Sequence, residues 1–198
     1  MTVELKDPQW TVFCSDKRFR VLVAGRRFGK TFLALTELCQ AAWGPGRAAW
    51  YVAPTYKQAK GVAWKALKQL TRPYWAAPPR ETELIIELAA GGSISLRGAD
   101  NYDSLRGHGL DFLVMDEYAS MDRAVWPEVL RPMLSDRQGR ALFIGTPRAP
   151  SLRRFVSTRN AYKARSRGSP SSVGTLKVAS LGSAFRKLIW LRGSTSRV

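Results

Sequence analysis

The feature that most constrains the fold is a glycine-containing segment that joins a predicted strand to a predicted helix. The strand is the short, largely apolar run Arg20–Ala24, and the segment after it ends in Gly-Lys-Thr at residues 29–31. Apolar residues then recur with helical spacing. A tight turn in this position directs successive backbone N–H groups and the positive end of the helix at one anion, so a phosphate group is the expected ligand.

Residues 24–31 have the sequence AGRRFGKT and are predicted to form a phosphate loop that binds ATP and Mg²⁺. Gly29 lets the backbone approach closely, Lys30 reaches the β- and γ-phosphates, and Thr31 supplies a hydroxyl to Mg²⁺. Arg26 is a candidate to stabilise charge on the γ-phosphate, with a solvent-facing side chain as the alternative. A chance Gly-Lys-Thr at a helix start is the alternative for the whole segment. The predicted nucleotide-binding residues here are Ala24, Gly25, Arg26, Arg27, Phe28, Gly29, Lys30 and Thr31.

A second apolar run, Phe112–Met115, ends at an acidic pair. Asp116 is predicted to hold Mg²⁺, and Glu117 to orient or deprotonate the water that attacks the γ-phosphate, with a solvated loop as the alternative. In the branch of phosphate-loop ATPases that carries such a glutamate (ASCE type), another strand separates the two motif strands. We expect Ala48–Ala53 to be that strand.

The order of apolar runs predicts an α/β fold over residues 1–148, a phosphate-loop NTPase with a mostly parallel sheet and flanking helices. Three predicted strands end in polar or glycine-containing segments, and ligands bind at such carboxyl ends. The third of these segments is Gly145-Thr146-Pro147. The other expected elements are a helix capped by Thr55 and running to about Leu70, a β-hairpin from Glu81–Leu88 and Ser93–Arg97, a helix at Trp126–Leu134 and a strand at Ala141–Ile144.

One face of the helix after the phosphate loop is expected to be buried. That face is formed by Phe32, Leu35, Leu38, Cys39 and Ala42. The chain has two cysteines, Cys14 and Cys39, which are too few for a disulfide framework or a zinc site. Packing is therefore the expected role of Cys39.

The net charge of +17 favours a polyanionic partner, with DNA or RNA ahead of an anionic membrane surface. Residues 149–198 contain eleven Lys and Arg residues and no Asp or Glu, and they lack periodicity. They are predicted to form a basic tail of low order. One interpretation is a shifted reading frame; the other is a tail that grips DNA phosphates. No apolar stretch reaches the length of a spanning helix, so no membrane-spanning segment is expected, and a membrane is not among the predicted partners.

Four segments, in the order AGRRFGKT, YVAPTYKQAK, LRGADNYDSLRGHGLDFLVMDEYA and LFIGTPR, resemble the large terminase subunit of tailed phages. The resemblance covers about residues 8–148 and implies an ATPase motor that packages viral DNA. It implies that Thr146 belongs to a coupling motif that senses the γ-phosphate, and that Gln9, with Trp10, contacts adenine. It also implies that Arg106 reaches the ATP of a neighbouring subunit; a DNA-contacting or purely structural arginine is the alternative.

The resemblance further implies double-stranded DNA, a portal protein, a small terminase subunit and a ring of identical chains as partners. The implied location is the bacterial host cytoplasm, transiently at the procapsid portal. A large terminase continues into a nuclease domain with clustered carboxylates, whereas this chain has no acid after Asp136, so no nuclease activity is expected from it. Two alternatives remain: a helicase-like ATPase that acts on nucleic acid, and an inactive prophage remnant that binds nucleic acid.

Overall fold

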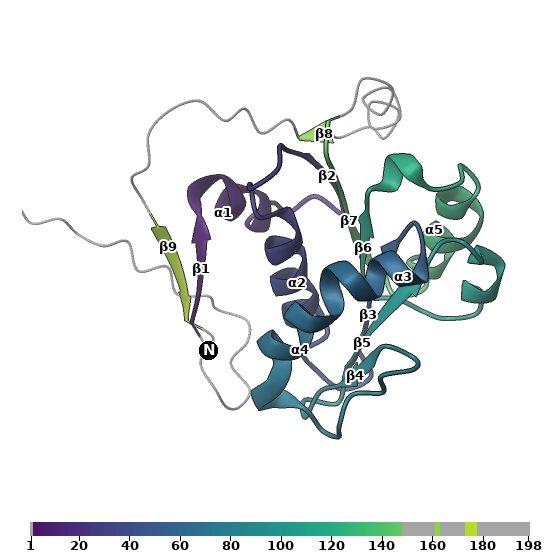
Figure 1. Ribbon diagram of the computed structural model, residues 1–198, viewed down its shortest axis with the longest axis horizontal. Helices are drawn as coiled ribbons and strands as arrows, with labels where there is room; N and C mark the ends of the chain where they lie inside the picture. The colour runs from purple at the N-terminus through teal and green to yellow at the C-terminus, as the bar shows by residue number, and fades with distance from the viewer. Residues whose placement is uncertain (1, 148–160, 163–172, 178–198) are drawn as a thin grey trace, which may run out of the picture.

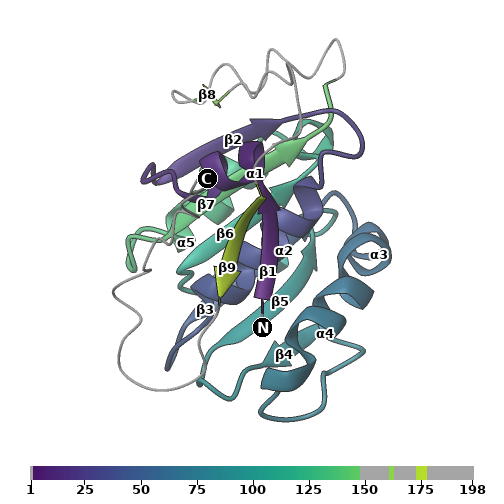
Figure 2. The same cartoon turned by 90° about the vertical axis from the view of Figure 1, so that its left-hand side faces the viewer.

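The computed structural model describes residues 2–147, 161–162 and 173–177. A seven-stranded sheet forms the centre, with the order β4-β5-β3-β6-β7-β2-β8 (Figure 2). Within it β4 runs antiparallel to β5, and the other neighbouring strands are parallel. The strands are β2 (Phe19–Val23), β3 (Ala48–Ala53), β4 (Ile85–Glu87), β5 (Ser93–Gly98), β6 (Phe112–Asp116), β7 (Arg140–Gly145) and β8 (Ala161–Tyr162). A separate antiparallel ribbon pairs β1 (Thr2–Lys6) with β9 (Val173–Lys177).

Helices cover both faces of the sheet, as Figure 1 shows. One face carries α1 (Asp7–Phe13), α2 (Lys30–Ala41) and a continuous helical segment made of α3 (Tyr56–Ala59), a π-helical turn (Lys60–Trp64) and α4 (Lys65–Thr71). The other carries a π-helical turn (Val125–Leu130) and α5 (Arg131–Met133). Short 3₁₀ turns lie at Arg72–Tyr74, Tyr102–Leu105 and Tyr118–Ser120. The predicted α/β fold with a mostly parallel sheet is confirmed.

Most of the expected elements are present close to their predicted bounds. Thr55 caps the helix after β3, since its hydroxyl accepts a hydrogen bond of 3.2 Å from the backbone N–H of Gln58. The predicted hairpin is the antiparallel pair β4–β5, in which Ile86 lies opposite Ile94. The π-helical turns, β1 and α1 are not among the predicted elements, because such short segments carry little periodic signal.

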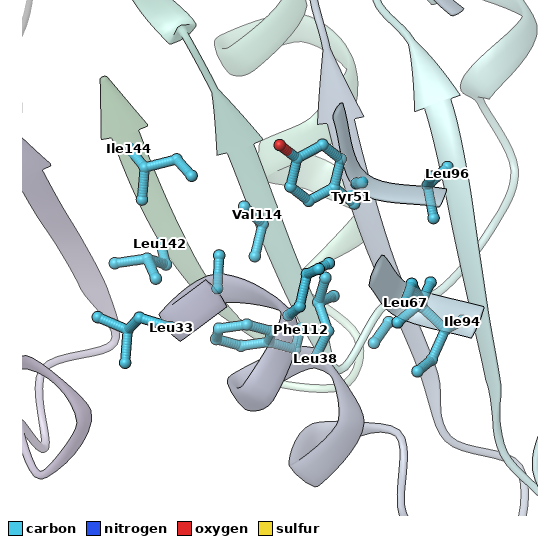
Figure 3. Close-up of a cluster of buried hydrophobic side chains, with 14 of the residues drawn as sticks. Leu33, Leu38, Tyr51, Leu67, Ile94, Leu96, Phe112, Val114, Leu142 and Ile144 are labelled. Carbon is cyan, nitrogen blue, oxygen red and sulfur yellow. The ribbon is translucent and has the colours of Figure 1, made fainter. Parts of the chain in front are cut away.

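The core consists of two layers, one on each face of the sheet, because successive strand residues point to opposite faces. On β6, Phe112 and Val114 pack in the layer beneath α2, whereas Leu113 and Met115 pack in the layer beneath α5. Figure 3 shows side chains of the first layer. These buried rows fix the strand ends of β2, β6 and β7 relative to one another.

The expected burial of Phe32 is wrong, since this side chain is 42% exposed. Apolar residues occupy more than one stripe of α2, and the sheet buries the stripe that contains Leu33, Ala34 and Leu38. Periodicity alone does not distinguish between overlapping apolar stripes on one short helix.

The expected position of Ala48–Ala53 between the two motif strands is also wrong. The strand between β2 and β6 is β7, and β3 lies on the far side of β6. Parallel strands are joined by crossovers, and a crossover allows the chain to leave a place in the sheet that a later strand fills. The consequence for the site is that Gly145 lies directly beside Val23, at the end of the strand that leads into the phosphate loop.

In the part of the chain that the structure describes, no helix is both long and apolar enough to cross a membrane. Most of the predicted basic tail, residues 149–198, lies outside the described residues. The division of the chain at residue 148 therefore stays a prediction.

Candidate active site

The predicted phosphate loop lies between the end of β2 and the start of α2. Its first residue is anchored to the neighbouring strand, since the N–H of Ala24 donates to the carbonyl of Gly145 at 3.2 Å. The Lys30 amine donates to the carbonyls of Ala24 at 2.7 Å and Gly25 at 3.1 Å. The lysine thus folds back over the loop, which is the side where an anion would meet both its amine and the N-terminus of α2.

Two loop residues have left-handed backbone conformations. Gly29 has a φ of 85°, which favours glycine, and a Cβ added there would lie 2.5 Å from Nε2 of Gln9 and would displace that amide. Arg27 has a φ of 67°, which is costly for a residue with a side chain. The tight turn that the sequence predicts is therefore formed partly at the expense of local backbone strain.

Gln9 on α1 holds the loop from behind. Its side chain is buried, and Nε2 donates to the carbonyls of Phe28 at 2.9 Å and Gly29 at 3.2 Å. Its Oε1 accepts from the N–H of Lys6 at 2.9 Å. Both ends of this amide are thus engaged within the protein. The adenine contact implied for Gln9 stays a prediction, while its contact with the phosphate loop is a role that the sequence did not indicate.

The acidic pair lies at the carboxyl end of β6. Asp116 is buried, and its Oδ2 accepts a hydrogen bond from the Tyr51 hydroxyl. Burial raises the pKa of Asp116 above its ordinary value, and the hydrogen bond from Tyr51 opposes that shift. Glu117 follows with a φ of 48°, and its Oε1 accepts from the Thr146 hydroxyl at 2.9 Å. The structure therefore brings the candidate base and the predicted coupling motif into direct contact.

The phosphate loop and the acidic pair share one site. Burial lowers the pKa of the Lys30 amine, and the negative charges of Glu117 and Asp116 oppose that effect. They can do so because β2 and β6 both run parallel to β7, which places their carboxyl ends at the same edge of the sheet. The lysine of the loop and both carboxylates consequently converge on one region at that edge.

The oxygen ligands at this site suit Mg²⁺. Thr31 offers a hydroxyl and Asp116 a carboxylate, and Mg²⁺ prefers such oxygen ligands, takes one or two carboxylates from the protein and completes its shell with phosphate oxygens and water. Burial disfavours the negative charge of the Asp116 carboxylate, and a cation bound next to it would stabilise that charge. The residues predicted as metal ligands thus fit the ion.

The candidate arginines differ in their surroundings. Arg26 and Arg27 are exposed on the loop. Arg106 is exposed as well, pairs with Asp103 at 3.2 Å and donates to the carbonyl of Glu128 at 3.3 Å. These contacts hold Arg106 against its own loop and the adjacent π-helical turn. A role toward a neighbouring subunit, a DNA contact and a structural role all remain consistent with this placement.

Tyr51 is the residue of this site that the sequence did not indicate. It lies within the apolar run of β3, and such a run predicts a strand without assigning a task to any one residue. The available signal was its hydroxyl, since a tyrosine in a fully buried strand needs a hydrogen-bond partner. The partner, Asp116, is 65 residues away in the chain and was not identifiable from local pattern.

Known proteins resemble this chain in sequence and in structure. A family model described as the N-terminal region of the terminase large subunit, T4-like virus type, matches residues 21–157. The large terminase subunit of Thermus phage G20c is 31% identical over 160 residues, which cover 71% of this chain and 33% of that protein. That of Escherichia phage T5 is 35% identical over 139 residues, covering 67% and 32%. This chain thus spans about a third of the length of these curated relatives.

Solved structures resemble it as well. The large terminase ATPase domain of Thermus phage P74-26 has a TM-score of 0.63 and 29% sequence identity, covering 75% of this chain and 68% of that one. The large terminase from another thermophilic bacteriophage shares the fold, with a TM-score of 0.67 at 15% identity over 81% of this chain and 45% of that one.

Proposed function

The chain belongs to the family of phage terminase large subunits, and from that premise we propose that it binds Mg²⁺·ATP and hydrolyses it as the motor domain of a DNA-packaging machine. The observation that carries the proposal is geometric: parallel pairing of β2 and β6 with β7 brings the loop with the Lys30 amine and the acidic pair Asp116-Glu117 to the same edge of the sheet. A protein of the same fold, the second of the two solved large terminases, is also known in complex with ADP and with ATP-gamma-S. That supports a nucleotide as the ligand of this chain.

Each residue of the site has its own proposed role in ATP hydrolysis. Lys30 and the N–H groups of the loop bind the phosphates, and Arg26, which is exposed on the loop, would contact the γ-phosphate. Thr31 and Asp116 would hold Mg²⁺, which when bound neutralises charge on the β- and γ-phosphate oxygens. Exclusion of solvent around Asp116 strengthens the electrostatic contact that this carboxylate would make with the ion.

Glu117 is the proposed base. It orients a water molecule toward the γ-phosphorus and accepts its proton as the bond to the bridging oxygen of ADP breaks. The Thr146 hydroxyl donates to one oxygen of this carboxylate at 2.9 Å and so restricts its rotation. A γ-phosphate that also engages Thr146 would change this contact, which links the state of the nucleotide to the loop after β7.

Replacement of Glu117 tests the proposal. Glu117→Gln should retain affinity for ATP, because size and hydrogen-bonding capacity are kept, but turnover should fall by a factor on the order of 10² or more. Binding is measured with a fluorescent nucleotide and turnover by phosphate release. Glu87→Gln serves as the matched control, because Glu87 lies on the edge strand β4 and pairs there with Arg80. It should leave ATP affinity and turnover unchanged.

Three results would contradict parts of the proposal. Unchanged turnover in Glu117→Gln removes that residue from the mechanism. A wild-type chain that binds DNA but neither binds nor hydrolyses ATP identifies the remnant that binds nucleic acid. Separation of the strands of a forked duplex identifies the helicase-like alternative.

The proposed partners follow from the family rather than from the geometry. They are double-stranded DNA, a portal protein, a small terminase subunit and further copies of this chain in a ring, within the bacterial host cytoplasm and at the procapsid portal. The net charge of +17 supports a nucleic-acid partner. Because no acid follows Asp136, we expect no DNA cleavage by this chain.

A further inference from the structure

Tyr51 lies in the centre of the sheet, next to the predicted metal ligands. Its side chain is fully buried in the layer beneath α2, yet its hydroxyl points toward the carboxyl ends of the strands, as Figure 3 shows. In the pairing of β3 with β6, Tyr51 lies opposite Val114. Asp116 is two residues further along β6 and therefore on the same face. The phenol ring spans this step and brings its hydroxyl to Oδ2 of Asp116.

The hydroxyl of Tyr51 is not needed to fill space. A phenylalanine ring would occupy almost the same volume, and a buried hydroxyl costs free energy unless it is hydrogen-bonded. The hydroxyl therefore acts through its contact with Asp116 rather than through packing.

The Tyr51 hydroxyl faces both predicted metal ligands. It donates a hydrogen bond to Oδ2 of Asp116, and it is also hydrogen-bonded with the Thr31 side chain. The phenol thus lies between the two residues that suit Mg²⁺, one on the phosphate loop and one on β6.

We propose that Tyr51 is a positioning residue that fixes the Asp116 carboxylate in the orientation needed to hold Mg²⁺ with the nucleotide. This inference rests on the proposed ATPase function. The physical reason is that a ligating carboxylate with a free torsion must lose rotational freedom when it binds, whereas one already held by a hydrogen bond does not. The role is indirect, since Tyr51 acts through Asp116.

Tyr51→Phe removes the hydroxyl and keeps the ring. The Mg²⁺ concentration for half-maximal ATP turnover should rise about 10-fold or more. Turnover at saturating Mg²⁺ should largely recover, and affinity for ATP in EDTA should be unchanged. As a readout independent of turnover, the affinity for Mn²⁺ in the presence of ADP, followed by electron paramagnetic resonance, should fall by a similar factor.

Tyr56→Phe is the matched control. It also removes one phenol hydroxyl, which donates to the carbonyl of Thr82 at 2.6 Å, and that hydrogen bond involves no residue of the nucleotide site. Its Mg²⁺ midpoint and Mn²⁺ affinity should equal those of the wild type. A general loss of packing would weaken ATP binding with and without metal, and so is distinguished from a change in metal affinity alone.

The outcomes separate the inference from the function on which it rests. If the wild type hydrolyses ATP and Tyr51→Phe keeps the same Mg²⁺ midpoint and Mn²⁺ affinity, the inference is overturned and the function stands. If the wild type neither hydrolyses ATP nor binds Mn²⁺ with ADP, the proposed function itself fails.

A second variant covers the case in which Tyr51→Phe does not fold. Asp116→Asn removes the buried charge, so adding Tyr51→Phe to it no longer leaves a carboxylate without its donor. The double variant should bind Mn²⁺ no more weakly than Asp116→Asn alone. A further loss of affinity would mean that Tyr51 does not act through Asp116, which also overturns the inference.

Discussion

At the scale of single residues, the candidate site depends on a few contacts that no substitution of similar type would preserve. Gly29 illustrates this, because an added Cβ would meet two obstacles. The backbone has a left-handed φ of 85°, and the Cβ would lie only 2.5 Å from Nε2 of Gln9. A larger residue there has to displace the amide that holds the carbonyls of Phe28 and Gly29. The loop geometry and the buried glutamine are thus one unit.

Gly29→Ala should therefore lose affinity for ATP and some stability. The left-handed conformation alone costs an alanine roughly 1–2 kcal/mol, and displacement of Gln9 adds to that cost. Urea unfolding and nucleotide binding measure the two effects. Gly61→Ala, where an added Cβ meets nothing within 4 Å, is the matched control and should be neutral or slightly stabilising. Equal behaviour of the two variants would contradict the steric argument.

At the scale of elements, a buried ion pair joins the strand and the helix that flank the phosphate loop. Arg20 on β2 and Glu37 on α2 are 4% and 5% exposed, and the guanidinium contacts both carboxylate oxygens. The same guanidinium donates to the carbonyl of Val12 on α1 at 2.8 Å. One side chain thus ties together three elements around the loop.

Removal of one residue of this pair should strongly lower the free energy of unfolding. Glu37→Ala leaves the buried guanidinium of Arg20 uncompensated, and breaking a buried pair in this way costs roughly 3–5 kcal/mol. Replacement of both residues by apolar side chains, Arg20→Met with Glu37→Leu, should cost less, because no charge is then stranded. Urea unfolding of the single and double variants tests this. A double variant that is less stable than Glu37→Ala would show that the pair itself supplies net stability.

A surface pair provides the comparison for this prediction. Glu81 pairs with Lys68 near the end of α4, and its side chain is 54% exposed. Glu81→Ala should lower the free energy of unfolding much less than Glu37→Ala does, because water can solvate the Lys68 amine once the carboxylate is removed.

At the scale of the whole molecule, charge is distributed unevenly along the chain. Eleven basic residues and no acids occupy residues 149–198, which the structure describes only in part. The part matched by the family model, residues 21–157, ends within this basic segment. DNA binding is therefore best examined as a property of the entire chain.

The entire chain should bind double-stranded DNA without sequence preference. The logarithm of its binding constant should fall linearly with the logarithm of the salt concentration. The triple variant Lys163→Ser, Arg165→Ser and Arg167→Ser should reduce that slope by about 1 for each DNA phosphate that is no longer neutralised. Fluorescence anisotropy at several salt concentrations measures it. The matched control changes three exposed lysines of the folded domain, Lys57, Lys60 and Lys65, to serine. A slope altered only in the control would place DNA on the domain and favour the shifted-frame interpretation of the tail.

Pattern along the chain was enough to predict the α/β class, the glycine-containing loop after β2, the acidic pair and the strands that carry them. These features rest on local physics: the tight glycine-containing turn before Lys30, the apolar run that ends at Asp116 and the spacing of apolar residues on one helix. Each involves residues a few positions apart, so the pattern along the chain is sufficient to identify them.

How these parts meet in space became evident from the three-dimensional arrangement. It placed β7 between β2 and β6, left Phe32 exposed, set Gln9 behind the loop and brought Tyr51 to Asp116. Gln9 and Tyr51 act across 19 and 65 residues of chain. The contact of Tyr51 with Asp116 depends on which strands lie side by side, and local pattern does not encode which place in the sheet a crossover reaches, because many strand orders bury the same apolar rows.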